Sequence, residues 1–312
     1  MTPEMAALLT QIKMLASLLV IGFASQRLRL MKDGAINELS TLLTHLILPC
    51  MLLTLIGGSG DRSDLITILP YVLCCIVLCI INVTLGYGSA KLTGLTSPTK
   101  NAHVMVAAFG NGGFIGVPMI TAMFGSEAGL WAAAYLIVES SMYWIFGPLI
   151  ADCSDGPKKI SFRRLVTPLT IAIFLGLCIL VLSLPVKDFV FWTTLESVGG
   201  CAKYLAALYI GMDLGRKGLK KMFSRWQLLV GCALKLIAFP ILGYLIFGKT
   251  GLITGQALTI FVLLYATPTG MAVPILAKEG KADDDYATAG TMLATILCLG
   301  TMPLVLWLIS LF

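Results

Sequence analysis

Residues 107–120 read AAFGNGGFIGVPMI, and residues 265–276 read YATPTGMAVPIL. Both stretches lie in long apolar runs, yet both are rich in glycine and proline. In a helix interior, glycine costs about 1 kcal/mol and proline about 3 kcal/mol relative to alanine. Irregular backbone at membrane depth survives only inside protein or against a water-filled cavity. The two stretches therefore predict two broken membrane helices that border an internal site.

The rest of the chain has the composition of an integral membrane protein. Of its 312 residues, 58% are hydrophobic and 12% are charged, whereas soluble domains have about 45–50% and about 25%. A membrane-spanning helix needs about 20 apolar residues, and ten such runs cover most of the chain. We predict an all-α membrane fold with ten transmembrane helices at 6–24, 39–57, 65–90, 102–124, 128–150, 166–184, 194–214, 227–247, 252–277 and 286–311.

The basic residues predict an orientation. Of the 22 lysines and arginines, sixteen fall in the loops that follow odd-numbered spans, three in the opposite loops and three within spans. Loops rich in lysine and arginine stay on the cytoplasmic side. The chain is therefore expected to be a multi-pass protein of the inner (plasma) membrane with both termini on the non-cytoplasmic side. No cleaved signal peptide is expected, because no basic segment precedes the first apolar run.

Short strings recur at a nearly constant offset. Leu85-Gly86-Tyr87 recurs as Leu242-Gly243-Tyr244, Val117-Pro118 as Val273-Pro274, and Pro148-Leu149 as Pro303-Leu304. This predicts two five-helix repeats, 1–155 and 156–312. An odd number of spans per repeat inverts the second copy in the membrane, and inverted repeats are typical of secondary transporters.

The breaks in spans 4 and 9 then predict a binding site near the midplane. The second half of each span is expected to begin around Gly112–Gly113 and Thr269–Gly270. Each start would present unpaired N–H groups and a partial positive charge, which suits a carboxylate. The alternative is a pair of proline kinks that serve packing only. The candidate substrate-binding residues are Asn111, Gly112, Gly113, Pro118, Thr267, Pro268, Thr269, Gly270 and Pro274.

Ionisable residues inside spans are functional candidates, because they are costly at membrane depth. Lys235 and Lys203 would favour an anionic substrate if they line a cavity, and either could instead extend towards the interface. Lys13 has the same two options, and its role is left open. Glu139 is the one acid near the middle of a span, where it either pairs with a lysine or carries a coupling proton.

Other chemistry is not indicated by the sequence. The nine cysteines include no CxxC pair, and eight of them lie in apolar runs, where they are interpreted as small buried hydrophobes. Asp283-Asp284-Asp285 lacks the spacing of a calcium loop and is expected to cap the last span. No Walker A, HExxH or GxSxG string occurs. We therefore expect no enzyme activity, metal, cofactor or nucleic-acid partner.

Five strings carry a family resemblance: LTHLILPCMLL (43–53), GNGGFIGVPMI (110–120), LAALYIGMDL (205–214), LKLIAFP (234–240) and ATPTGMAVPILAKEG (266–280). The chain resembles the auxin efflux carrier family, relatives of the plant PIN carriers and of bacterial malonate and malate permeases. The resemblance implies that spans 4 and 9 cross at their breaks. It also implies a scaffold of spans 1, 2, 6 and 7, a transport unit of spans 3–5 and 8–10, and a homodimer within the lipid membrane.

Two features depart from the family pattern. Tyr204 stands where the family often has proline, and the loop at 151–165 is much shorter than in plant members. The leading hypothesis is a secondary transporter or efflux carrier of a small organic anion that works by alternating access. The alternatives are Na⁺-coupled symport, as in bile acid carriers, and a membrane sensor with the same fold that binds without transporting.

Overall fold

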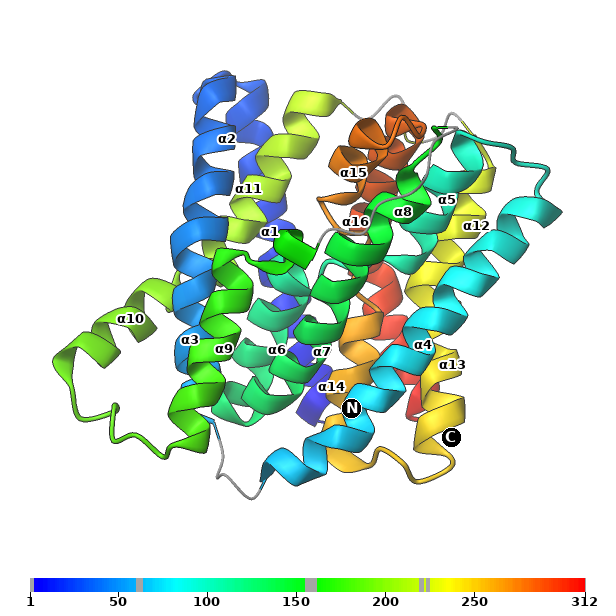
Figure 1. The fold of residues 1–312 in the computed structure, drawn as a ribbon. Coiled ribbons are helices and arrows are strands. Elements are labelled where there is room, and N and C mark those ends of the chain that lie inside the picture. The colour runs from blue at the N-terminus through cyan, green and yellow to red at the C-terminus, as the bar shows by residue number, and fades with distance from the viewer. Residues whose placement is uncertain (1–2, 60–63, 155–161, 219–221, 223–224, 312) are drawn as a thin grey trace. The chain divides into compact units, whose positions relative to one another are not determined.

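A computed structural model describes residues 3–59, 64–154, 162–218, 222 and 225–311. Five basic residues of the orientation count lie outside this part of the chain: Arg62, Lys158, Lys159, Lys220 and Lys221. Within the described residues the protein is built from helices (Figure 1), and the sole β-type pairing is an isolated bridge.

Six helical stretches among the described residues are long and apolar enough to cross a membrane. Two shorter apolar helices, Pro168–Val181 and Gly255–Tyr265, lie at the predicted spans 6 and 9. A multi-pass, all-helical membrane protein is therefore supported, whereas the count of ten spans in two inverted repeats stays a prediction. The six stretches are Pro3–Arg27, Gly34–Gly57, Ile68–Leu92, Gly112–Ala151, Gln227–Gly248 and Asp284–Ile309.

The chain divides into two compact units, and the first comprises Met1–Leu69, Gly113–Ala134 and Val166–Leu219. Within it α1 packs along α11 (Figure 1), where a Cβ atom at Gly22 or Gly211 would overlap a backbone carbonyl of the other helix. Such small residues let membrane helices approach closely. Its helices are α1 (Pro3–Arg27), α2 (Asp33–Leu42), α3 (Leu48–Gly57), α6 (Val117–Phe124), α9 (Pro168–Val181), α10 (Val190–Gly200) and α11 (Ala202–Lys217).

The second unit comprises Pro70–Gly112, Tyr135–Leu165 and Lys220–Phe312. Two helices, α4 (Asp64–Leu92) and α7 (Gly129–Ser141), run from one unit into the other. The core of this unit is largely apolar, but buried polar side chains lie at the breaks of spans 4 and 9 and also away from them, as at Ser89 and His103. Its other helices are α5 (Thr99–Ala108), α8 (Gly147–Ala151), α12 (Gln227–Ala233), α13 (Phe239–Gly243), α14 (Gly255–Tyr265), α15 (Val273–Glu279) and α16 (Asp284–Ile309).

Four helices carry a π-helical turn directly before a proline. These turns are η1 (Leu43–Ile47), η2 (Gly112–Gly116), η4 (Met142–Phe146) and η7 (Leu234–Ala238), and each is followed by a helix with proline at its first or second position. Proline has no N–H to donate and its ring strikes the carbonyl of the preceding turn. A locally widened turn takes up that conflict without ending the helix.

Asp283 confirms the expectation that the acidic run caps the last span. It is the N-cap of α16, and its Oδ1 accepts a hydrogen bond from the Tyr286 N–H at 2.9 Å. Its Oδ2 accepts from Thr99 Oγ1 at 2.7 Å and from Arg225 Nη1 at 2.8 Å. Burial raises the pKa of this carboxyl, but the hydrogen bonds and the guanidinium outweigh it, so the net pKa is below its ordinary value.

We expect Asp283→Asn to lower the thermal midpoint of the detergent-solubilised protein at pH 7, because a capping and ion-pairing carboxylate is worth about 1 kcal/mol or more. A depressed folded-state pKa contributes stability above the unfolded pKa, and this is lost as the pH falls through the folded pKa. The difference between wild type and variant should therefore shrink below about pH 4. Asp284→Asn is the neighbouring control, and equal midpoints for all three proteins at pH 7 would contradict the assignment.

Candidate functional site

The two predicted breaks pair with each other inside the second unit. Helix α5 ends at Ala108 and α14 ends at Tyr265, and each is followed by a short non-helical segment. Gly110 and Thr269 form an antiparallel bridge, and the Gly270 N–H donates to the Phe109 carbonyl at 3.3 Å. The backbone groups released by each break are thus partly satisfied by the other break, as a site at membrane depth requires.

Side-chain hydroxyls satisfy further carbonyls at the ends of the broken helices. Thr269 Oγ1 donates to the Val106 carbonyl of α5 at 2.7 Å. Thr267 Oγ1 donates to the Leu264 carbonyl of α14 at 2.6 Å. The last carbonyls of a helix have no partner within it, so both threonines act as caps. Tyr143 OH donates to the Gly110 carbonyl at 2.6 Å, within the first break.

Glu139, on α7, holds the start of the second half of span 4. Its Oε1 accepts from Tyr135 OH at 2.7 Å and from the Gly112 N–H at 3.3 Å. Gly112 is the first residue of η2, and a carboxylate at a helix start is favoured by the orientation of the peptide dipoles. The sequence predicts that Glu139 pairs with a lysine or carries a proton; its hydrogen bonds are with Tyr135 and Gly112.

Lys235 lies in the π-helical turn η7 and is 1% exposed. Its Nζ donates to the carbonyl of Tyr265, the last residue of α14, at 2.7 Å. Lys235 and Glu139 are also close enough to interact electrostatically. The paired breaks therefore contain one buried base and one buried acid, each attached to an end of a broken helix.

Within the breaks, the side chain of Asn111 has a hydrogen-bond donor without a partner. It is 3% exposed, and its Nδ2 has no hydrogen-bond partner among the described residues. A buried donor without a partner costs free energy, so such a group needs a specific explanation. Asn82 on α4 is the other buried amide of this kind, and neither its Oδ1 nor its Nδ2 has a partner there.

The structure differs from the sequence-based picture in where the free N–H groups lie. The second half of span 9 begins at Val273, three residues after Gly270, with Pro274 at the start of α15. Thr269 instead forms the bridge with Gly110, with Pro268 before it and Gly270 after it in the chain. The N–H groups of Gly112 and Gly270, which were expected to face a substrate, are already used within the protein.

Three candidate residues belong to the first unit: Gly113, Pro118 and Lys203. Gly113 has open space around its Cβ position. Pro118 and Lys203 line the same cavity, of about 430 Å³, to which Lys187 and Glu196 also contribute. The ammonium of Lys203 stacks on the ring of Tyr204, 4.8 Å from its centroid. Lys13 is exposed on α1.

The tyrosines are the site residues that sequence reasoning missed. Tyr135 and Tyr143 hold Glu139 and Gly110, and Tyr265 OH donates to the Cys75 carbonyl at 2.8 Å. Tyr135 stands four residues before Glu139, a spacing that places both on one helix face. That spacing is the signal that would have identified it.

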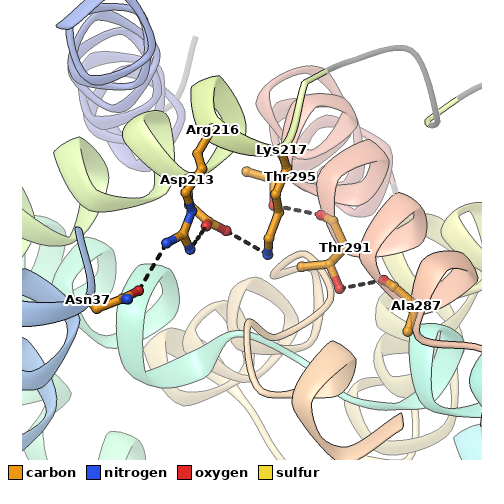
Figure 2. A network of polar contacts seen from close by, with 7 residues as sticks. All are labelled: Asn37, Asp213, Arg216, Lys217, Ala287, Thr291 and Thr295. Carbon is orange, nitrogen blue, oxygen red and sulfur yellow. Dashed lines mark hydrogen bonds and ion pairs between the residues drawn. The ribbon is translucent and has the colours of Figure 1, made fainter. Parts of the chain in front are cut away.

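A second polar network occupies the cytoplasmic end predicted for span 7. Asp213 is 3% exposed and holds Arg216 Nη2 at 2.6 Å and Lys217 Nζ at 2.8 Å, while Arg216 Nη1 donates to Asn37 at 2.9 Å (Figure 2). Asp213 is thus buried and paired with two cations. Figure 2 also shows Thr291 and Thr295 of α16, which donate to carbonyls one turn earlier.

The helical fold, the apolar spans and the paired breaks define a multi-pass membrane transport protein. A family profile described as "Membrane transport protein" matches residues 7–161 and 157–306, and the chain belongs to this family. The predicted resemblance to the auxin efflux carriers is confirmed by this match.

Two relatives agree with the family assignment. An "Uncharacterized transporter" of Methanothermobacter thermautotrophicus is 26% identical over 290 residues, which cover 92% of this chain and 93% of the relative. A "Putative malonate transporter" of Rhizobium meliloti is 22% identical over 311 residues, which cover 94% of this chain and 92% of the relative.

The close pairing of the breaks makes Gly270 intolerant of a side chain. A Cβ atom there would overlap the Gly110 carbonyl and the Tyr143 hydroxyl. We expect Gly270→Ala to cost about 1–3 kcal/mol, in line with overpacked cores, and to lower the thermal midpoint in detergent. Gly113→Ala is the matched control, since nothing lies within 4 Å of its Cβ position. Equal midpoints for the two variants would show that the breaks are not packed as described.

Proposed function

We propose that this protein is a secondary carrier that moves a small organic anion with a carboxylate group across the membrane. The observation that carries the proposal is the buried Nδ2 of Asn111, a hydrogen-bond donor without a partner in the paired breaks. A donor at this place is satisfied when an acceptor ligand binds, and a carboxylate oxygen is a strong acceptor. The site is then complete only with its substrate bound.

The formal charges within the paired breaks are compatible with an anionic substrate. Lys235 and Glu139 offset each other formally, so a negative substrate meets no uncompensated carboxylate within the paired breaks. Discontinuous helices at the midplane are the common construction of secondary transporter sites. The malonate named for the Rhizobium meliloti relative is a small dicarboxylate and fits this class of substrate.

We propose that transport occurs by alternating access in a fold of ten helices arranged as two inverted repeats, 1–155 and 156–312. The matching starts of α6 and α15, each with a Val-Pro pair as its first two residues, support the repeat. The division into two compact units supports movement of one body against another. The expected scaffold and homodimer stay predictions of the family resemblance.

The proposal predicts that Asn111→Ala reduces malonate uptake into proteoliposomes at least about tenfold, because a hydrogen bond to a charged group contributes about 1.5–3 kcal/mol. Asn111→Asp is expected to reduce uptake further, since its carboxylate would repel the negatively charged substrate. Asn101→Ala, a change of the same type in the helix that leads into the break, is the control. Wild-type uptake by folded Asn111→Ala protein would refute the proposed site.

The predicted orientation is tested by fusions to alkaline phosphatase, which is active only outside the cytoplasm. We expect an active fusion after Leu311 and an inactive fusion after Gly218, because the basic residues collect in the loops that follow odd-numbered spans. Activity is measured in intact cells and normalised to the amount of fusion protein. The opposite pattern would show that the topology is the inverse of the predicted one.

A further inference from the structure

The C-terminal end of α14 favours a positively charged group. Its last carbonyls carry a partial negative charge, and at membrane depth they need partners inside the protein. The Leu264 carbonyl is capped by Thr267, but the Tyr265 carbonyl has as its partner the ammonium of Lys235. Lys235 reaches it from a different helix, since η7 and α14 are separate elements of the second unit.

The opposite charge is attached to the other broken helix. Glu139 accepts the Gly112 N–H at the start of η2 and interacts electrostatically with Lys235. The carboxylate thus stands at a helix start and the ammonium at a helix end, each where the peptide dipoles favour its charge. Both side chains are buried, so either charge without the other would be costly.

In many secondary transporters, the ends of half-helices and unwound carbonyls at the midplane coordinate a bound Na⁺. We propose that in this protein the ammonium of Lys235 takes the place of such a coupling cation. The chain itself supplies the positive charge that neutralises Glu139 and the end of α14. Lys235 is then a positioning residue for the paired breaks, and not a direct contact of the substrate.

This inference rests on the proposed function, because it assigns a role at the same paired breaks. It separates the protein from the Na⁺-coupled alternative: transport should need no Na⁺ from solution. It also implies that removing the lysine side chain opens a cation-sized position beside the Tyr265 carbonyl, which a small soluble cation can enter.

The test compares wild type and Lys235→Ala in proteoliposomes, with labelled malonate as the probe. Wild-type uptake is expected to agree within about twofold in NaCl and choline chloride, because a tethered ammonium makes bulk Na⁺ unnecessary. In choline chloride, Lys235→Ala is expected to lose at least about tenfold, since it leaves a buried carboxylate unpaired. NaCl or methylammonium chloride should then raise its uptake at least about threefold.

Lys91→Ala, which removes an exposed lysine at the end of α4, controls for loss of a positive charge. Three results would overturn the inference: wild-type uptake that requires Na⁺, unchanged uptake by Lys235→Ala in choline chloride, or folded Lys235→Ala that neither Na⁺, K⁺ nor methylammonium restores. Lys235→Gln replaces Lys235→Ala if the latter does not fold.

A readout without transport separates this inference from the proposed function. Bound cation stabilises the folded state, so NaCl should raise the thermal midpoint of Lys235→Ala by about 3 °C or more relative to choline chloride and leave wild type unchanged. If wild type moves no malonate but these midpoints behave as expected, the substrate assignment fails and the role of Lys235 stands. If NaCl stabilises wild type as much as the variant, the role of Lys235 fails.

Discussion

Backbone N–H and C=O groups at membrane depth must find partners inside the protein, because hydrocarbon offers none. An unbroken helix meets this requirement by itself, but the glycine- and proline-rich stretches of spans 4 and 9 cannot. The structure meets it by pairing one break with the other, through the bridge between Gly110 and Thr269 and the contact from Gly270 to Phe109. The polar contacts around the two breaks follow from that pairing.

Several of the groups left over by the breaks are met by particular side chains. Two threonines cap the carbonyls at the helix ends, Tyr143 binds the Gly110 carbonyl, and Lys235 binds the Tyr265 carbonyl. Glu139 takes the free N–H at Gly112. Among the described buried side-chain donors within the breaks, the Nδ2 of Asn111 is left without a hydrogen-bond partner. The side-chain donor that this network leaves without a partner is therefore the group that we expect to bind the ligand.

The same constraint explains the π-helical turns. A proline in a membrane helix removes a donor and crowds the preceding turn, and water cannot repair the loss. In η1, η4 and η7 the turn before the proline is widened and the helix continues across the defect, whereas η2 is the first turn of the half-helix that follows the break. Two of these turns also hold candidate residues, since η2 begins at Gly112 and η7 contains Lys235. The π-helical turns η2 and η7 thus both precede a proline and position residues of the candidate site.

Composition and local pattern were enough to predict a multi-pass helical membrane protein, the two breaks and the cap at Asp283, because these depend on apolar length, on proline and glycine, and on neighbours a few residues apart. The sequence also singled out Asn111, Lys235 and Glu139, since polar groups in apolar runs stand out. It could not assign their partners. Lys235 and Tyr265 are 30 residues apart in sequence and Gly110 and Thr269 are 159 apart, so only the tertiary structure decides which groups meet. For that reason the N–H groups of Gly112 and Gly270, which the sequence predicts to be free, form hydrogen bonds within the protein. The side-chain donor without a partner is instead the Nδ2 of Asn111.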